Sequence, residues 1–92
     1  MAPASLLKEV RLDAERHRAT GNTRHYVGGN LHEGGFTALR IVQYANDGAY
    51  YLLYIGPGGH QVTDTWHQTL EDALHQAELE FSVRSGDWSD AH

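Results

Sequence analysis

The sequence has no cysteine, which excludes disulfide bonds, zinc–thiolate sites and a thiolate nucleophile. It also has no surplus of basic residues: seven Lys and Arg stand against twelve Asp and Glu, a net charge of −5. Nucleic-acid binding depends on basic residues that displace counterions from phosphates, so we expect no nucleic-acid partner. No apolar run approaches the roughly 20 residues of a membrane-spanning helix, and residues 1–18 contain no apolar core of a secretory signal. We therefore expect no membrane partner and a cytoplasmic location.

The length of 92 residues, with 40% hydrophobic and 21% charged residues, is typical of a single folded domain. The charge is unevenly spread along it. Residues 1–63 hold five acids and six bases, a net charge of +1, whereas residues 64–92 hold seven acids and one base, a net charge of −6. The C-terminal third is thus acidic, which bears on association and solubility rather than on fold.

Residues 1–20 predict an amphipathic helix. Ser5 is a suitable N-cap, and turn chemistry follows at Thr20-Gly21-Asn22. The apolar residues fall close to an i, i+3, i+4, i+7 spacing: Leu6, Leu7, Val10 and Ala14. Residues 21–35 then form a Gly-rich connector, in which Thr23–Val27 predicts a short strand.

Residues 36–67 predict an antiparallel meander. Strands are expected over 36–45, 49–55 and 60–66, because Asn46-Asp47-Gly48 and Gly56-Pro57-Gly58-Gly59 supply the turns between them. A helix over 69–83 follows, capped by Thr69, with an apolar stripe of Leu70, Ala73, Leu74, Ala77 and Phe81. In the tail, 84–92, Trp88 is expected to fold back onto the core. The predicted fold class is α+β: a meander of three to four strands with an N-terminal and a C-terminal helix packed on the sheet.

The strand over 49–55 is apolar on both faces, since Tyr50, Leu52 and Tyr54 alternate with Tyr51, Leu53 and Ile55. Such a strand must be covered on both faces. The C-terminal helix covers one; the N-terminal helix, a second subunit or another protein must cover the other. We therefore expect a non-enzymatic protein-interaction domain that self-associates as a homodimer through its apolar sheet face. The candidate partner-binding residues are Tyr50, Tyr51, Tyr54, Trp66 and, as a rim charge, Arg40. Trp66 is also a candidate core lid, the interpretation favoured by its place just before the helix cap.

Two alternatives remain open. An immunity-type inhibitor would present an acidic helix face, with Glu71, Glu78 and Glu80, to a basic toxin. A small metal-dependent or acid–base enzyme would use His60, Asp64 and His67. His67, Glu71 and His75 have the i, i+4, i+8 spacing of a helical metal site, but the cap at Thr69 places His67 outside the helix. The run over 28–35 lacks the lysine of a phosphate-binding loop. We expect no cofactor.

Several short segments within residues 50–88 carry a family resemblance. They are Tyr51-Leu52-Leu53-Tyr54, Thr63-Asp64-Thr65-Trp66-His67, Leu70-Glu71-Asp72-Ala73, Gln76-Ala77-Glu78-Leu79-Glu80-Phe81 and Asp87-Trp88. This part of the chain resembles a group of small uncharacterised bacterial proteins, in which a β-meander is closed by one amphipathic helix. The resemblance implies a fold but no catalytic residues. Toxin-neutralising immunity proteins are similar only in size, acidity and αβ architecture.

Overall fold

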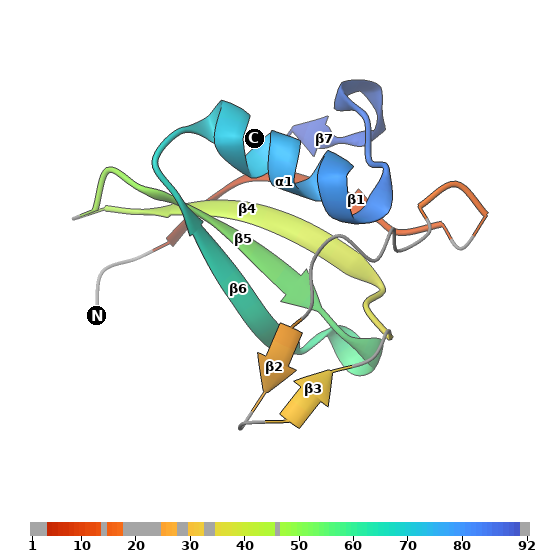
Figure 1. Ribbon diagram of the computed structural model, residues 1–92. Coiled ribbons are helices and arrows are strands. Elements are labelled where there is room, and N and C mark those ends of the chain that lie inside the picture. The colour runs from red at the N-terminus through yellow and green to blue at the C-terminus, as the bar shows by residue number, and fades with distance from the viewer. Residues whose placement is uncertain are drawn as a thin grey trace.

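The computed structural model describes residues 4–13, 15–17, 25–27, 30–32, 35–45 and 47–90. Within these residues the chain forms a five-stranded antiparallel sheet in the order β6-β5-β4-β1-β7, with one helix, α1, lying across one face (Figure 1). The elements of this layer pair are β1 (Ala4–Arg11), β4 (Ala38–Tyr44), β5 (Tyr50–Ile55), β6 (Gln61–His67), α1 (Leu70–Phe81) and β7 (Ser89–Asp90). Two short strands, β2 (His25–Val27) and β3 (Asn30–His32), pair separately with each other. The α+β class is confirmed.

The meander β4-β5-β6 follows the predicted order, with antiparallel pairing between consecutive strands. Asp47 holds the first turn: one carboxylate oxygen accepts a hydrogen bond from the Ala49 N–H at 2.9 Å, and the other accepts one from the Tyr51 hydroxyl at 2.7 Å. The second turn is a 3₁₀ turn, η1 (Pro57–Gly59), where Gly58 and Gly59 have φ of 87° and 84°. Such left-handed backbone favours glycine, which explains the Gly-rich sequence there.

The prediction of an N-terminal helix was wrong, because residues 4–11 form β1, which pairs with β4 along its length. The register of this pairing shifts between Leu6 and Lys8, as in a β-bulge. The bulge brings both Leu7 and Val10 to the side covered by α1, although an uninterrupted strand would place residues three apart on opposite sides. A bulged strand therefore produced the spacing that we interpreted as helical. Residues 12–13 and 15–17 are also described and are not helical, whereas Ala14 and the turn at 20–22 lie outside the described residues.

The fourth sheet strand is also different from the one expected. The predicted strand over 23–27 is partly described, as β2, but it pairs with β3 rather than joining the main sheet. The additional strands of the sheet are instead β1 and β7, which come from the two ends of the described chain. The predicted connector over 21–35 falls largely outside the described residues, apart from β2, β3 and Gly35.

Helix α1 begins and ends for identifiable reasons. The Thr69 side chain accepts a hydrogen bond from the Asp72 N–H at 3.1 Å, which confirms the predicted N-cap. Ser82 ends the helix in a left-handed conformation, with φ 58° and ψ 28°. The predicted stripe faces the sheet: Ala73, Ala77 and Phe81 are buried, and Leu70 and Leu74 pack beside them. Trp88 is buried in the same core, as expected.

The C-terminal segment packs against β1. β7 pairs with β1, and the Lys8 ammonium contacts the Asp90 carboxylate at 2.5 Å. His17 is buried, and its Nδ1 accepts the Asp13 N–H at 2.9 Å, so its Nε2 carries the proton and donates to Asp87 at 3.1 Å. Asp87, in the 3₁₀ turn η2 (Ser85–Asp87), also pairs with Arg16. A backbone hydrogen bond from Arg84, and then His17 and Arg16, lower the pKa of Asp87 below its ordinary value.

Candidate functional site

The candidate site is the face of the sheet opposite α1, which we call the helix-free face. Its centre is a small apolar cluster of Val42, Leu53 and Ile55. Residues directly opposite each other in antiparallel strands point to the same side, so the register identifies the other residues of this face. Trp66 pairs with Tyr51, Tyr51 with Val42, and Val42 with Leu6. We call these four residues the apolar row; it runs across β6, β5, β4 and β1.

Both ends of the apolar row are open to solvent. Trp66 on β6 is 59% exposed and Leu6 on β1 is 41% exposed, while Val42 between them is 5% exposed. Trp66, Leu6 and Leu79 are the exposed large hydrophobic residues in the described part of the chain. Two of these three residues therefore lie in one row on one face.

The tyrosines of this face are held in place. Tyr44 and Tyr51 meet edge to face, with ring centroids 5.1 Å apart. The hydrogen bond from the Tyr51 hydroxyl to Asp47 fixes the ring further, and it raises the pKa of Tyr51. The pKa of Asp47 is lowered, mainly by the Ala49 N–H and then by Tyr51. This part of the face is a rigid aromatic surface, which loses little conformational entropy on binding.

Charged residues occupy the next row of the helix-free face. Asp64 pairs with Leu53, Leu53 with Arg40, and Arg40 with Glu9. The Arg40 Nε lies 2.5 Å from a carboxylate oxygen of Glu9. Charge therefore borders the apolar row, as it borders the apolar centre of most protein interfaces.

The structure places three of the five predicted partner-binding residues, Tyr51, Trp66 and Arg40, on this face. Trp66 is exposed, so the interpretation of this residue as a core lid was wrong. Tyr50 and Tyr54 pack with the core on the side of α1, and Tyr54 is fully buried. Because side chains alternate along a strand, Tyr50 and Tyr54 cannot share a face with Tyr51. Their prediction as partner-binding residues of that face was therefore wrong.

The acid–base candidates do not come together in one site. Asp64 pairs with Leu53 on the helix-free face, whereas His67 pairs with Tyr50 on the side of α1. His60 is exposed beside the η1 turn, before β6 begins. The His67 Nε2 lies 2.7 Å from the Thr65 hydroxyl, and burial lowers the pKa of His67, with Asp72 and then Glu80 opposing the shift. The enzyme hypothesis based on these three residues has no support in this geometry.

The helical metal candidates are separated by the cap. His67 ends β6, while Glu71 and His75 lie beyond the Thr69 cap on α1. Among the described residues, no group of three His, Asp or Glu has the arrangement of a metal site. None of the described helices is long and apolar enough to cross a membrane.

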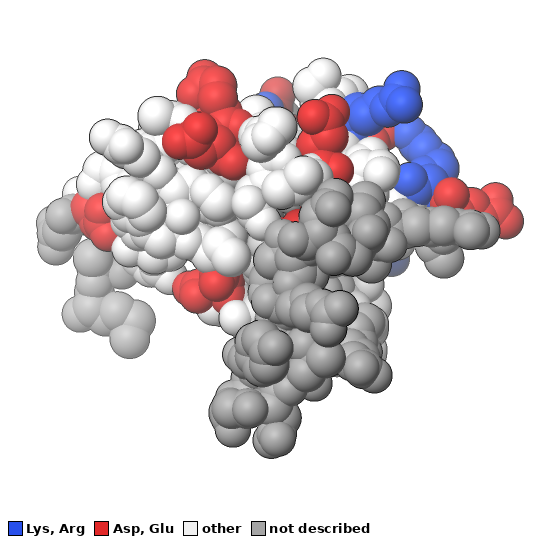
Figure 2. Space-filling model, viewed as in Figure 1, with Lys and Arg blue, Asp and Glu red and all other residues white. Residues whose placement is uncertain are grey.

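The predicted acidic face of α1 is smaller than expected. Glu71 and Glu78 are exposed, and acidic side chains are visible over the helix in Figure 2. Glu80 is only 4% exposed and accepts hydrogen bonds from the Tyr54 hydroxyl and from the Gln76 amide, the latter at 3.0 Å. Glu80 therefore anchors α1 to β5, and it is not available to a basic toxin.

Sequence reasoning missed Leu6 as a surface residue and Glu80 as a buried one. Leu6 was assigned to a helix, so its position opposite Val42 was not foreseen. A signal for Glu80 was present, because it lies three residues beyond Ala77 and one before Phe81, close to the apolar stripe.

Comparison with known protein families, with curated proteins and with solved structures finds no match to the chain. The resemblance of residues 50–88 to small bacterial proteins stays a prediction.

Proposed function

We propose that this protein is a non-enzymatic interaction domain that binds a second copy of itself through the helix-free face. The observation that carries the proposal is the apolar row, which crosses four strands and is open at Trp66 and at Leu6. Apolar surface of this kind favours association, because water is released from it on contact.

A second copy is the occupant that the pattern of this face fits best. A two-fold axis along the apolar row lays each residue of the row against the same residue of the other copy, which gives an isologous interface. Tyr44 lies two residues beyond Val42 on β4, and Arg40 lies two residues before it. The same axis therefore sets the ring of Tyr44 over the guanidinium group of Arg40 in the second copy, a favourable cation–π pair formed twice.

Two leucines allow a matched test. Leu6 on the helix-free face is 41% exposed and Leu79 on α1 is 40% exposed. Arginine at either position adds the same charge to a surface of the same accessibility. We expect the wild-type chain to have twice the 10.3 kDa protomer mass by light scattering across a dilution series. Leu6→Arg is expected to be monomeric, and Leu79→Arg to remain dimeric.

Circular dichroism and thermal unfolding serve as fold controls for each variant. Trp66→Arg, at the other end of the row on an edge strand, should reproduce the effect of Leu6→Arg if the whole row is buried in the dimer. A wild-type chain that stays monomeric at every concentration overturns the proposal. It also fails if folded Leu6→Arg and Leu79→Arg have the same mass.

A further inference from the structure

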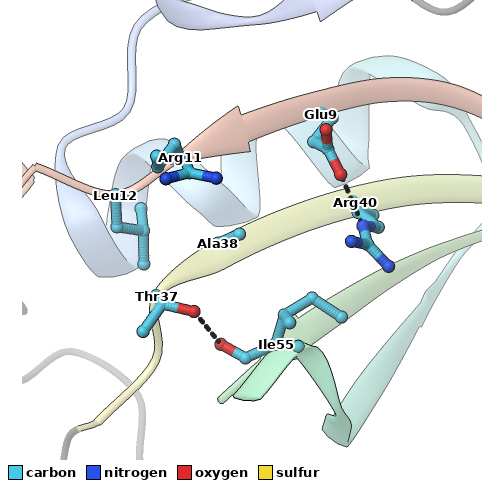
Figure 3. Close-up of a pocket in the computed structure, with 8 residues that line it drawn as sticks. Glu9, Arg11, Leu12, Thr37, Ala38, Arg40 and Ile55 are labelled. Atoms are coloured by element: carbon cyan, nitrogen blue, oxygen red, sulfur yellow. Dashed lines mark hydrogen bonds and ion pairs between the residues drawn. The ribbon is translucent and has the colours of Figure 1, made fainter. Parts of the chain in front are cut away.

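A hollow of about 420 Å³ lies on the helix-free face, away from the apolar row. Its walls include Glu9, Arg11 and Arg40, and its lining includes Leu12, Ala38 and Ile55 (Figure 3). The volume is within the range of sites that hold small molecules, roughly 300–1,000 Å³. The hollow adjoins the charged row, which supplies two of its walls, Glu9 and Arg40.

The register of β1 and β4 brings two arginines to this hollow. Arg11 pairs with Ala38, and Glu9 pairs with Arg40, so the two arginines are diagonal neighbours on one face. Ala38 contributes only a methyl group, and the Arg11 guanidinium lies near it, whereas the Arg40 guanidinium extends away from it in Figure 3. Glu9 balances the charge of Arg40 at 2.5 Å. Arg11 is exposed and forms no ion pair within the described residues, so the positive charge of its guanidinium group is available to a ligand.

The lining of the hollow also includes apolar residues. Ile55 is 2% exposed, and Leu12 and Ala38 are half-buried. A guanidinium group binds carboxylate and phosphate oxygens through two parallel hydrogen bonds, whereas apolar lining residues favour a hydrocarbon body. We propose that the hollow binds a small organic anion, with a carboxylate or phosphate group held by Arg11 and Arg40 and an apolar body resting on Leu12 and Ala38. Arg11 lies outside the apolar row, so a variant at Arg11 tests this site separately from self-association.

The proposal can be tested by NMR titration of the ¹⁵N-labelled protein with benzoate, phenyl phosphate and inorganic phosphate. We expect both organic anions to shift the side-chain Nε–H signals of Arg11 and Arg40 saturably, and comparison of the two identifies the preferred oxyanion. Inorganic phosphate, which lacks the apolar body, should bind more weakly. Arg11→Gln should weaken binding of the organic anions by about tenfold, the loss typical of a charge-assisted hydrogen bond.

Two variants control for charge. Glu9→Gln removes the carboxylate that competes for Arg40, and it should tighten binding. Arg84→Gln makes the same change of net charge as Arg11→Gln at an exposed arginine that is not part of this hollow, and it should leave the affinity unchanged. The proposal is overturned if no probe gives a saturable shift, or if Arg84→Gln weakens binding as much as Arg11→Gln. Equal affinity for inorganic and phenyl phosphate rules out the apolar part. The mass of Arg11→Gln is expected to equal that of the wild type, which separates failure of this site from failure of self-association.

Discussion

Replacing Tyr54 by phenylalanine removes a single hydroxyl group from the most deeply buried polar contact described above. Tyr54 is fully buried, and its hydroxyl donates to Glu80, which is 4% exposed. Burial, and then the hydrogen bond to Glu80, raise the pKa of Tyr54 far above its ordinary value, so the hydroxyl remains a donor at any working pH. In Tyr54→Phe the Glu80 carboxylate loses one donor and no solvent replaces it. A hydrogen bond to a buried charged group contributes about 2 kcal/mol, and we expect the free energy of unfolding to fall by that amount.

The measurement is urea and thermal unfolding of Tyr54→Phe beside Tyr51→Phe. For a domain of this size, about 2 kcal/mol corresponds to a fall of roughly 10 °C in the unfolding midpoint. Tyr51 makes the same kind of contact, to Asp47 at 2.7 Å, but on the half-exposed face, where water can replace the lost donor. Tyr51→Phe should therefore lower the midpoint clearly less. Equal losses in the two variants would refute the assignment of Glu80 as a buried anchor of α1.

Two further outcomes follow from the structure. Burial lowers the pKa of His67 in the folded state. Just below the ordinary histidine pKa of about 6.5, the unfolded state therefore binds more protons than the folded state. The free energy of unfolding should fall as the pH drops through this window. Urea unfolding at a series of pH values should show a smaller dependence in His67→Gln, and an unchanged dependence would contradict the assignment. Ser82→Gly should raise the unfolding midpoint by a few degrees, since φ of 58° costs a serine up to about 1 kcal/mol that glycine does not lose. A lower midpoint in calorimetry would show that the Ser82 side chain stabilises the helix end.

The meander and α1 could be predicted from the sequence because their signals are local. Asp47 and Gly48 mark one turn, the run over 56–59 marks the other, and Thr69 caps the helix that follows. Strand β1 could not be predicted in this way. Its two neighbours, β4 and β7, are distant in sequence, and its bulge between Leu6 and Lys8 disrupts the two-residue alternation. Tertiary pairing decided the structure of a segment whose spacing favoured a helix.

The candidate site was predictable only in part for the same reason. Alternation along β5 correctly assigned Tyr51 and Leu53 to a face apart from Tyr50 and Tyr54. The sequence did not show which face α1 covers, and so it placed Tyr54 among the partner-binding residues. The diagonal pair Arg11 and Arg40 depends on the register between β1 and β4, which becomes visible only when the strands are paired.

The position of β1 between β4 and β7 has a consequence for how the protein is made. The ribosome releases β1 first, yet β1 finds its first sheet neighbour only when β4 has emerged, and its second only with Ser89 and Asp90. Until β4 has emerged, Leu6 and Leu7 lie on an unpaired strand. Such a strand can pair with the exposed strand edges of other nascent chains. β7 then covers the edge of β1 at Lys8 and Glu9, where ion pairs of Asp87 and Asp90 hold the C-terminal segment. The edge of the sheet at Lys8 and Glu9 is thus completed only when the C-terminal segment folds back onto β1.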